Sequence, residues 1–296
     1  MPDPLPIAVV IPAHNRAAMV ARAVRSALAQ RPRPPAEVIV VDDCSTDGTA
    51  AAAEAAGARV IRHETNRGGA AARNTGIREV AHAWVALLDS DDEYLPDHLA
   101  TLWLERNGHV ILGSSAVACA PARSDVLIGR AGLGPQLLRS PGDVVRRGNP
   151  LVTSSVLVRR EVLAAVGGFR EGMPRSADFE LWLRVLEHGT GWVSPDVTVR
   201  YHVHGDQITH DLPRTYDAYE GVVDAARGQP WMSRAVAAAA DARLAVDRAR
   251  LELEAGRRGA ALRRLAGVVR DPLKAWAAAD LLVYRLRLRR ASAARA

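Results

Sequence analysis

The sequence predicts an α/β fold in which a largely parallel sheet is covered by helices on both faces and is followed by a C-terminal helical extension. In about the first hundred residues, short β-branched runs alternate with Ala-rich segments of helical periodicity. The strand segments are apolar throughout, which is typical of parallel strands buried on both faces. After residue 213 the helical pattern continues to the end. We therefore expect two parts, residues 1–210 and residues 211–296.

Four strands and their intervening helices account for the N-terminal part of this pattern. Gly57 ends the second helix, and Pro96 suits the first turn of the fourth. The predicted strands cover residues 7–11, 37–43, 58–63 and 83–89, and the predicted helices cover residues 16–30, 45–57, 68–81 and the segment that begins at Pro96.

The middle of the chain has a weaker pattern. Residues 109–120 and 152–160 have the composition of strands, whereas residues 121–150 are rich in Gly and Pro and are predicted to form a long loop over a site. A helix is expected over residues 176–189, and a strand over residues 197–205.

The composition excludes several classes of protein. Cys44 and Cys119 are too few for a disulfide framework, which suits a reducing compartment. The N-terminus has no basic region before its short apolar run, so we expect no signal peptide. No segment reaches the roughly 18 consecutive apolar residues of a spanning helix. We therefore expect a cytoplasmic protein that is not integral to a membrane.

The net charge of +6 is unevenly distributed along the chain. Residues 1–210 hold 22 basic and 23 acidic side chains, whereas the 40 residues from Arg257 onward hold 11 basic and 2 acidic ones. The basic character therefore belongs to the C-terminal tail. Nucleic-acid binding is not expected, because no recognition motif accompanies this charge.

Polar clusters follow each of the four predicted N-terminal strands. They read "PAHN", "DDCSTDGT", "NRGG" and "DSDD" in chain order. The carboxyl ends of parallel strands meet at one edge of a sheet, where open α/β folds bind their ligands. None of the loops is a dinucleotide-binding G-x-G-x-x-G or a phosphate-binding GxxxxGK[ST]. The clusters therefore predict a ligand site of another kind.

The cluster "DSDD" places Asp89 and Asp91 one residue apart at the end of a buried strand. Mg²⁺ and Mn²⁺ take carboxylate oxygens as ligands and complete their shells with water and substrate phosphates. The alternative is that the acids only start the helix at Pro96, where its dipole favours negative charge. We expect Asp92 and Glu93 to have this second role.

A second acidic pair, Asp178 and Glu180, lies at the start of the predicted helix 176–189. An ionised Asp178 in this place could take a proton from a hydroxyl as a general base. The alternative is an ordinary helix cap. His202 and His204 lie on one face of the last predicted strand, and His204 could reach a metal or a diphosphate, although such pairs are more often structural.

Six segments in this order resemble the motifs of family 2 glycosyltransferases with the GT-A fold. They read "VVIPAHNR", "EVIVVDDCSTDGT", "NRGGAAARNTGI", "VALLDSDDEYLPDHL", "TSSVLVRREVLAAVGGFRE" and "ADFELWLRVLEHG", and they span roughly residues 5–210. The resemblance implies a Rossmann-like mixed sheet with helices on both faces. It also implies an enzyme that transfers a sugar from a nucleotide sugar with inversion.

The resemblance also assigns residues to roles. Asp178 would be the catalytic base, and Asp89 and Asp91 would bind Mn²⁺ or Mg²⁺. His204 is a further candidate metal ligand from its position on the strand alone. The base bound by Asp43 is usually uracil in this family, so the donor would be a UDP-sugar. The residues expected to bind the nucleotide sugar are Pro12, Ala13, Asn15, Asp43, Arg67, Gly68, Arg73, Asp89 and Ser90.

Two departures from the family pattern limit what the resemblance implies. The position before the base is often acidic in the family, and here it is Ala177. The Q-x-x-R-W motif and the membrane helices of processive synthases are absent, so we expect transfer of a single sugar. The rival functions are a sugar-1-phosphate nucleotidyltransferase and a non-catalytic nucleotide-sugar-binding protein.

The acceptor is not predicted by the sequence; it can be lipid-linked, a glycan, a peptide or a small molecule. The basic tail carries apolar residues between its arginines, among them Leu262, Leu273 and Trp276. Such a segment can lie on the inner face of an anionic membrane as a peripheral contact. The alternative is packing on the catalytic domain or in a homodimer.

Overall fold

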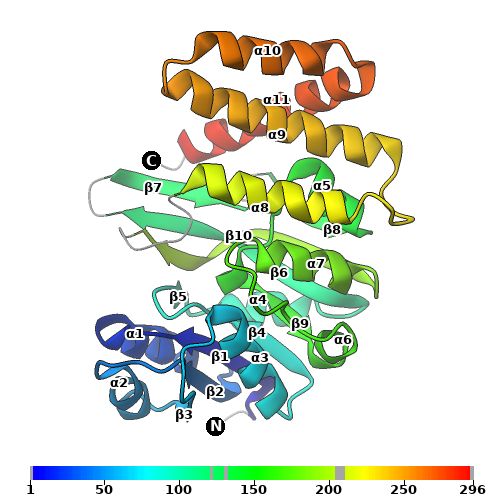
Figure 1. Cartoon of the computed structure of the whole chain (residues 1–296). Coiled ribbons are helices and arrows are strands. Elements are labelled where there is room, and N and C mark those ends of the chain that lie inside the picture. The colour runs from blue at the N-terminus through cyan, green and yellow to red at the C-terminus, as the bar shows by residue number, and fades with distance from the viewer. Residues whose placement is uncertain (1–2, 121–122, 130–132, 204–210, 294–296) are drawn as a thin grey trace.

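The computed structural model describes residues 3–120, 123–129, 133–203 and 211–293 (Figure 1). A ten-stranded sheet forms the centre of the molecule, with the strand order β3-β2-β1-β4-β9-β6-β10-β5. Strand β7 is added beside β6, and β8 beside β10. The predicted α/β class with a mixed sheet is confirmed.

The N-terminal half of the sheet is parallel, as predicted. It consists of β1 (Leu5–Ala13), β2 (Pro35–Asp42), β3 (Arg59–Arg62) and β4 (Trp84–Leu87). Successive side chains of a strand point to opposite faces, so Val9 of β1 packs in the core beneath α1 (Ala17–Leu28) and α2 (Thr49–Ala55). Val10 packs in the core beneath α3 (Gly69–Glu79). Gly76 lets α3 approach β1 closely, because a Cβ atom there would overlap Val10.

The remaining strands make the sheet mixed. Strand β9 runs antiparallel to both β4 and β6, whereas β6 and β10 are parallel. These elements are β5 (Glu93–Tyr94), α4 (His98–Leu104), β6 (His109–Ala120), β9 (Leu157–Arg159), α6 (Arg160–Ala165), α7 (Ala177–Leu186) and β10 (Thr190–His202).

The structure corrects three expectations in the middle of the chain. The expected loop over residues 121–150 contains β7 (Arg123–Ile128), β8 (Gln136–Leu138) and α5 (Pro141–Arg147). The Gly and Pro residues that suggested a loop separate these short elements, and Gly129 and Gly134 adopt positive φ between them. The expected strand 152–160 begins as a 3-10 helix, Thr153–Ser155. Strand β10 begins at Thr190, earlier than residue 197, because it pairs with β8 there.

The C-terminal part is helical, as predicted. It consists of α8 (Leu212–Ala225), α9 (Arg234–Glu254), α10 (Arg258–Val269) and α11 (Pro272–Ala293). Val222 and Val223 of α8 belong to the main core, whereas α10 and α11 pack on α9 through a small cluster that contains Ala242 and Val268. Figure 1 shows α9, α10 and α11 at the opposite end of the molecule from the N-terminal strands. The division at residue 210 stays a prediction.

Helices α10 and α11 present apolar side chains to solvent. Trp276 is 62% exposed and Val269 74% exposed. The other large apolar residues exposed on these two helices are Leu262, Leu273, Leu282, Val283 and Leu286. Among the helices within the described residues, none is both long enough and apolar enough to cross a bilayer.

Candidate functional site

A cavity of about 510 Å³ lies at the carboxyl ends of β1, β2 and β4. Its wall contains eight of the residues predicted to bind a nucleotide sugar or a metal, brought together from four segments of the chain. They are Pro12, Ala13, Asn15, Asp43, Arg73, Asp89, Ser90 and Asp91. The predicted convergence of the strand ends therefore produces one cavity.

The rim of this cavity is formed by two interlocked turns after β1 and β2. Asn15 and Cys44 adopt left-handed backbone conformations, with φ of 51° and 61°. Such conformations are uncommon for residues other than glycine. The Asn15 N–H donates to Ser45 Oγ at 2.9 Å, and Asn15 Oδ1 accepts from the Thr46 N–H at 2.9 Å. These bonds across the two turns hold the strained residues in place.

Asp43 lines the cavity and is held by the loop after β3. Its carboxylate accepts hydrogen bonds from the Arg67 and Gly68 N–H groups at 2.9 and 2.7 Å, and from His63 Nδ1 at 2.7 Å. Burial alone would raise the pKa of Asp43, but the hydrogen bonds from Arg67, His63 and Gly68 outweigh it and lower the pKa below the usual range. Arg67 and Gly68 thus act through their backbone on Asp43 and do not line the cavity.

The acidic cluster at the end of β4 is crowded. Carboxylate oxygens of Asp89, Asp91 and Asp92 lie within 4.8 Å of one another, and Arg73 forms an ion pair with Asp89. Burial raises the pKa of Asp89, and the positive charge of Arg73 offsets part of this increase. The carboxylates of Asp91 and Asp178 raise the pKa further. A set of close oxygen donors with unfavourable mutual repulsion fits a hard divalent cation such as Mn²⁺ or Mg²⁺.

The expectation that Asp92 and Glu93 favour the start of the next helix is wrong. Helix α4 begins at His98, with Asp97 at its N-cap position. Asp92 is 1% exposed and accepts hydrogen bonds from Ser154 Oγ at 2.5 Å and from the His202 N–H at 3.0 Å. Its burial, followed by the charge of Asp89, raises its pKa to about 8. Asp92 therefore ties the acidic cluster to two distant segments.

Glu93 also makes tertiary contacts. Its carboxylate lies 3.2 Å from Arg22 of α1 and 2.6 Å from His202 Nε2 at the end of β10. This contact gives His202 a structural partner. His204, the histidine predicted as a metal ligand, lies outside the described residues.

Asp178 lies in the first turn of α7, but it is not the helix cap. The N-cap residue is Ser176, which has a φ of 57°, and its side chain makes no capping hydrogen bond. Thr153 Oγ1 donates to Asp178 Oδ2 at 3.0 Å. The next residue, Ser154, donates to the Asp92 carboxylate and accepts from the Asp89 N–H, so two adjacent residues connect Asp178 with the acidic cluster. The structure thus places Asp178 beside the acidic cluster.

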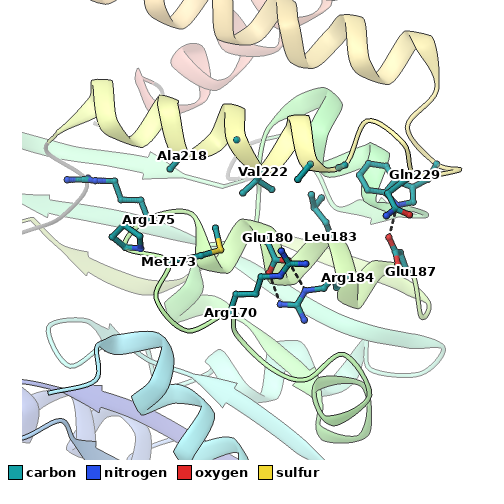
Figure 2. Close-up of a pocket in the computed structure, with 15 residues that line it drawn as sticks. Arg170, Met173, Arg175, Glu180, Leu183, Arg184, Glu187, Ala218, Val222 and Gln229 are labelled. Atoms are coloured by element: carbon teal, nitrogen blue, oxygen red, sulfur yellow. Dashed lines mark hydrogen bonds and ion pairs between the residues drawn. The ribbon is translucent and has the colours of Figure 1, made fainter. Parts of the chain in front are cut away.

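The structure separates Asp178 from Glu180. Figure 2 shows Glu180 between Arg170 and Arg184, with which it forms ion pairs of 2.8 and 2.6 Å. These residues line another cavity, of about 370 Å³, between α7 and α8. Only Asp178 of this pair is therefore in a position to take part in chemistry at the acidic cluster.

Several residues that line the 510 Å³ cavity were not predicted as site residues. They are His14, Arg16, Gly69, Ala72 and Tyr201. His14 stands inside the quoted motif "PAHN", and its Nδ1 lies 2.8 Å from the Asp43 carbonyl oxygen, so its motif could have suggested it. Tyr201 comes from β10, far along the chain, and no local pattern connects it with the N-terminal strands.

The comparisons with known proteins agree with this geometry. Residues 8–123 match the sequence profile of Glycosyl transferase family 2. The succinoglycan biosynthesis protein ExoU of Rhizobium meliloti is 32% identical over 246 residues, which are 76% of this chain and 71% of the relative. The chain belongs to glycosyltransferase family 2.

The family assignment confirms the resemblance and makes the protein a glycosyltransferase. The putative colanic acid biosynthesis glycosyl transferase WcaA of Escherichia coli is 26% identical over 72% of this chain and 78% of its own length. Two solved structures share the fold. TarS of S. aureus, in complex with UDP-GlcNAc, matches with a TM-score of 0.64 at 18% identity, over 83% of this chain and 72% of its own. The mannosyltransferase PcManGT of Pyrobaculum calidifontis, in complex with GDP-Man and Mn²⁺, matches with a TM-score of 0.61 at 19% identity, over 98% and 88% of the two chains.

Proposed function

We propose that this glycosyltransferase transfers a single sugar from a UDP-sugar to an acceptor hydroxyl, with inversion at the anomeric carbon. One observation carries the proposal: adjacent residues, Thr153 and Ser154, bond Asp178 and the acidic cluster, and Asp89 and Asp91 of this cluster line the same cavity as Asp43. A donor whose nucleotide reaches Asp43 and whose diphosphate reaches Asp91 would present its sugar toward Asp178.

The cavity supports binding of a nucleotide. The ionised Asp43 in its wall can accept a hydrogen bond from an N–H of uracil, and the cavity volume suits a nucleotide. The related fold of TarS was solved with UDP-GlcNAc, whereas that of PcManGT was solved with GDP-Man. The nucleotide therefore has to be tested directly.

Asp89 and Asp91 would hold the divalent cation, which is Mn²⁺ or Mg²⁺. When bound, this ion supplies positive charge that stabilises the departing diphosphate. Both carboxylates line the cavity, and we expect metal affinity to depend most on Asp91, the second acid of the D-x-D pair.

Asp178 would act as the general base. Thr153 donates to one of its carboxylate oxygens and orients the group, so the other oxygen can accept the proton of the acceptor hydroxyl. The hydroxyl oxygen forms a bond to the anomeric carbon from one side. The bond from that carbon to the diphosphate oxygen breaks on the other side, and its electron pair leaves with the nucleoside diphosphate.

A panel of UDP-, GDP- and dTDP-sugars, each with Mn²⁺, tests the function. We expect one UDP-sugar to be hydrolysed slowly to UDP and free sugar when no acceptor is present. Release of inorganic diphosphate from a nucleoside triphosphate and a sugar 1-phosphate would instead establish the nucleotidyltransferase. Nucleotide binding without turnover, even with acceptors of lipid, peptide and glycan type, would establish a binding protein.

We also propose that α10 and α11 contact the anionic surface of the inner membrane face. The support is their outward-facing apolar side chains together with the 11 basic and 2 acidic side chains from Arg257 onward. Two copies of this surface would repel each other, whereas anionic lipid would complement its charge. This favours a peripheral membrane contact over the homodimer.

A further inference from the structure

A separate cavity of about 240 Å³ begins at Asp178 and extends toward the C-terminal helices. One wall comes from Asn149 and from the segment 175–179 at the start of α7. The opposite wall comes from α8 and α9. The residues that line it are Asn149, Arg175, Ser176, Asp178, Phe179, Thr215, Tyr216, Tyr219, Arg243, Leu244 and Asp247. Asp178 lines this cavity, and the adjacent residues Thr153 and Ser154 bond Asp178 and Asp92, so the cavity adjoins the proposed donor site.

The charges in this cavity are balanced. Arg243 lies 3.6 Å from Asp247, and Asp247 also pairs with Arg285 of α11 at 2.5 Å. Arg175 lies 3.7 Å from Asp211. Each arginine on the wall therefore has a carboxylate neighbour, and the cavity offers no excess positive charge for a phosphate group. A neutral ligand suits it better than an anion.

One aromatic ring and one guanidinium group are available to such a ligand. The ring of Tyr219 stacks on Phe179 with a centroid distance of 4.6 Å and has Arg243 5.1 Å from its centroid, so it is occupied. Tyr216 is half-buried and lines the cavity. Arg243 lines the cavity with a partly exposed side chain, so its guanidinium group can donate to a ligand oxygen.

The position of Arg243 depends on Gly148. A Cβ atom at this glycine would overlap the guanidinium group, and Gly148 also has a φ of 93°. The close approach of the backbone thus leaves Arg243 lying along the wall of the cavity rather than projecting into solvent.

We propose that this cavity is the acceptor subsite and binds one neutral sugar unit of a saccharide acceptor. The proposal rests on the proposed function, because it takes Asp178 as the base. A pyranose has apolar C–H faces that can stack on Tyr216 and a rim of hydroxyls that can bond to Arg243, Asp247 and Asn149. The volume is below the roughly 300 Å³ of the smallest pockets for drug-sized ligands, which limits the occupant to about one ring.

The subsite gives the C-terminal extension a part in specificity. Tyr216 comes from α8, and Arg243 and Asp247 come from α9, so all three lie outside residues 8–123 that match the family profile. One hydroxyl of the bound sugar would reach Asp178, lose its proton to it and attack the anomeric carbon of the donor. The other hydroxyls would select the acceptor.

Saturation-transfer NMR with simple glycosides tests this subsite. The probes are the methyl glycosides of glucose, galactose, mannose and N-acetylglucosamine, each added to the protein with UDP and Mn²⁺. We expect at least one glycoside to bind. Tyr216→Ala and Arg243→Met should each weaken its binding by about tenfold. Tyr216→Phe keeps the ring, and Arg234→Met removes an exposed arginine of α9 that does not line the cavity, so both should bind normally.

The same samples separate the two proposals. UDP binding is measured by calorimetry in each of them, so a loss of UDP binding is a failure of the proposed function. Intact UDP binding without binding of any glycoside overturns the subsite, as does glycoside affinity unchanged by Tyr216→Ala and Arg243→Met. Displacement of the glycoside by inorganic diphosphate after saturation with UDP would show an anion site instead. Glycoside binding without any transfer would leave the subsite in place and contradict the proposed reaction.

Discussion

The two ends of the molecule use their side chains in opposite ways. In the N-terminal sheet, apolar residues are buried and the polar residues of four loops converge on one cavity. In α10 and α11, large apolar residues such as Trp276 face solvent and are accompanied by many arginines. The first arrangement encloses a small ligand, and the second presents a surface. The comparison therefore separates a cavity inside the fold from an exposed apolar and basic face outside it.

The largest expected effect concerns the base. Asp178→Asn keeps the size of the side chain but removes its ability to take a proton, so we expect transfer to fall by about 10³-fold while UDP affinity is unchanged. Initial rates of transfer and calorimetric UDP binding measure the two quantities. The matched control is Glu180→Gln, which removes the neighbouring carboxylate of α7; it should lower stability through its ion pairs but not abolish transfer. Near-normal turnover of Asp178→Asn would mean that the base lies elsewhere.

The acidic cluster should show the next largest effect. Asp91→Asn removes a charged oxygen ligand, so UDP affinity in the presence of Mn²⁺ should fall by about 100-fold and lose its dependence on the metal. Titration of UDP with and without Mn²⁺ measures this. Glu161→Gln, at an exposed position of α6, is the control and should bind as the parent does. If Asp91→Asn still responds to Mn²⁺, Asp91 is not the ligand.

The outward face of the extension can be tested with lipid vesicles. The double change Trp276→Ser and Val283→Ser removes two exposed apolar side chains, so we expect partitioning onto vesicles with anionic lipid to fall by about tenfold. Sedimentation with vesicles measures it, and zwitterionic vesicles should bind the parent weakly. The control is Leu104→Ser, which removes a 75% exposed leucine from α4. Equal binding by both variants, or a dimer in solution that the double change disrupts, would contradict the membrane contact.

The smallest expected effect is on the pH dependence of stability, through His98, a buried histidine at the start of α4. Its imidazole is fully buried, its Nδ1 bonds to Thr198 Oγ1 at 2.8 Å, and burial lowers its pKa from 6.5 to about 3. Between these values the unfolded chain binds a proton that the folded protein does not. The free energy of unfolding should therefore fall by about 1.4 kcal/mol per pH unit as the pH decreases below 6.5.

Urea denaturation at several pH values, compared between the parent and His98→Leu, isolates this contribution. The variant lacks the titrating group, so the difference in slope between the two proteins should equal the effect of His98. Identical pH dependence would show that His98 is protonated in the folded protein.

The sequence predicted the part of the site that is formed by the strand ends, because local sequence patterns identify those strands. Strands such as residues 7–11 and 83–89 are recognisable from their apolar runs, and the parallel arrangement then brings Asp43 and Asp91 to one edge. The environment of Asp92 was not predictable in this way. Its partners, Ser154 and His202, are 62 and 110 residues away along the chain.

The cavity of about 240 Å³ beside Asp178 could not be predicted from local sequence patterns either. Tyr216 and Arg243 belong to helices that were correctly expected, but nothing in helical periodicity indicates that α8 and α9 pack beside Asp178. The short β5 was missed because two residues carry no periodic signal, and its pairing with β10 is purely tertiary. Local patterns therefore predict elements and strand ends, whereas contacts between distant elements require the structure.

The strained turns at Asn15 and Cys44 have a consequence for the rate at which a nucleotide binds. Because side chains of each turn already hold the other, the rim does not have to be ordered when a ligand arrives, and ordering a loop residue costs about 1–2 kcal/mol. Association should therefore follow a single concentration-dependent step without a slow rearrangement of the rim. Asn15 and Cys44 therefore hold the rim in one conformation before the ligand binds, and the conformational entropy of ordering the rim is lost during folding.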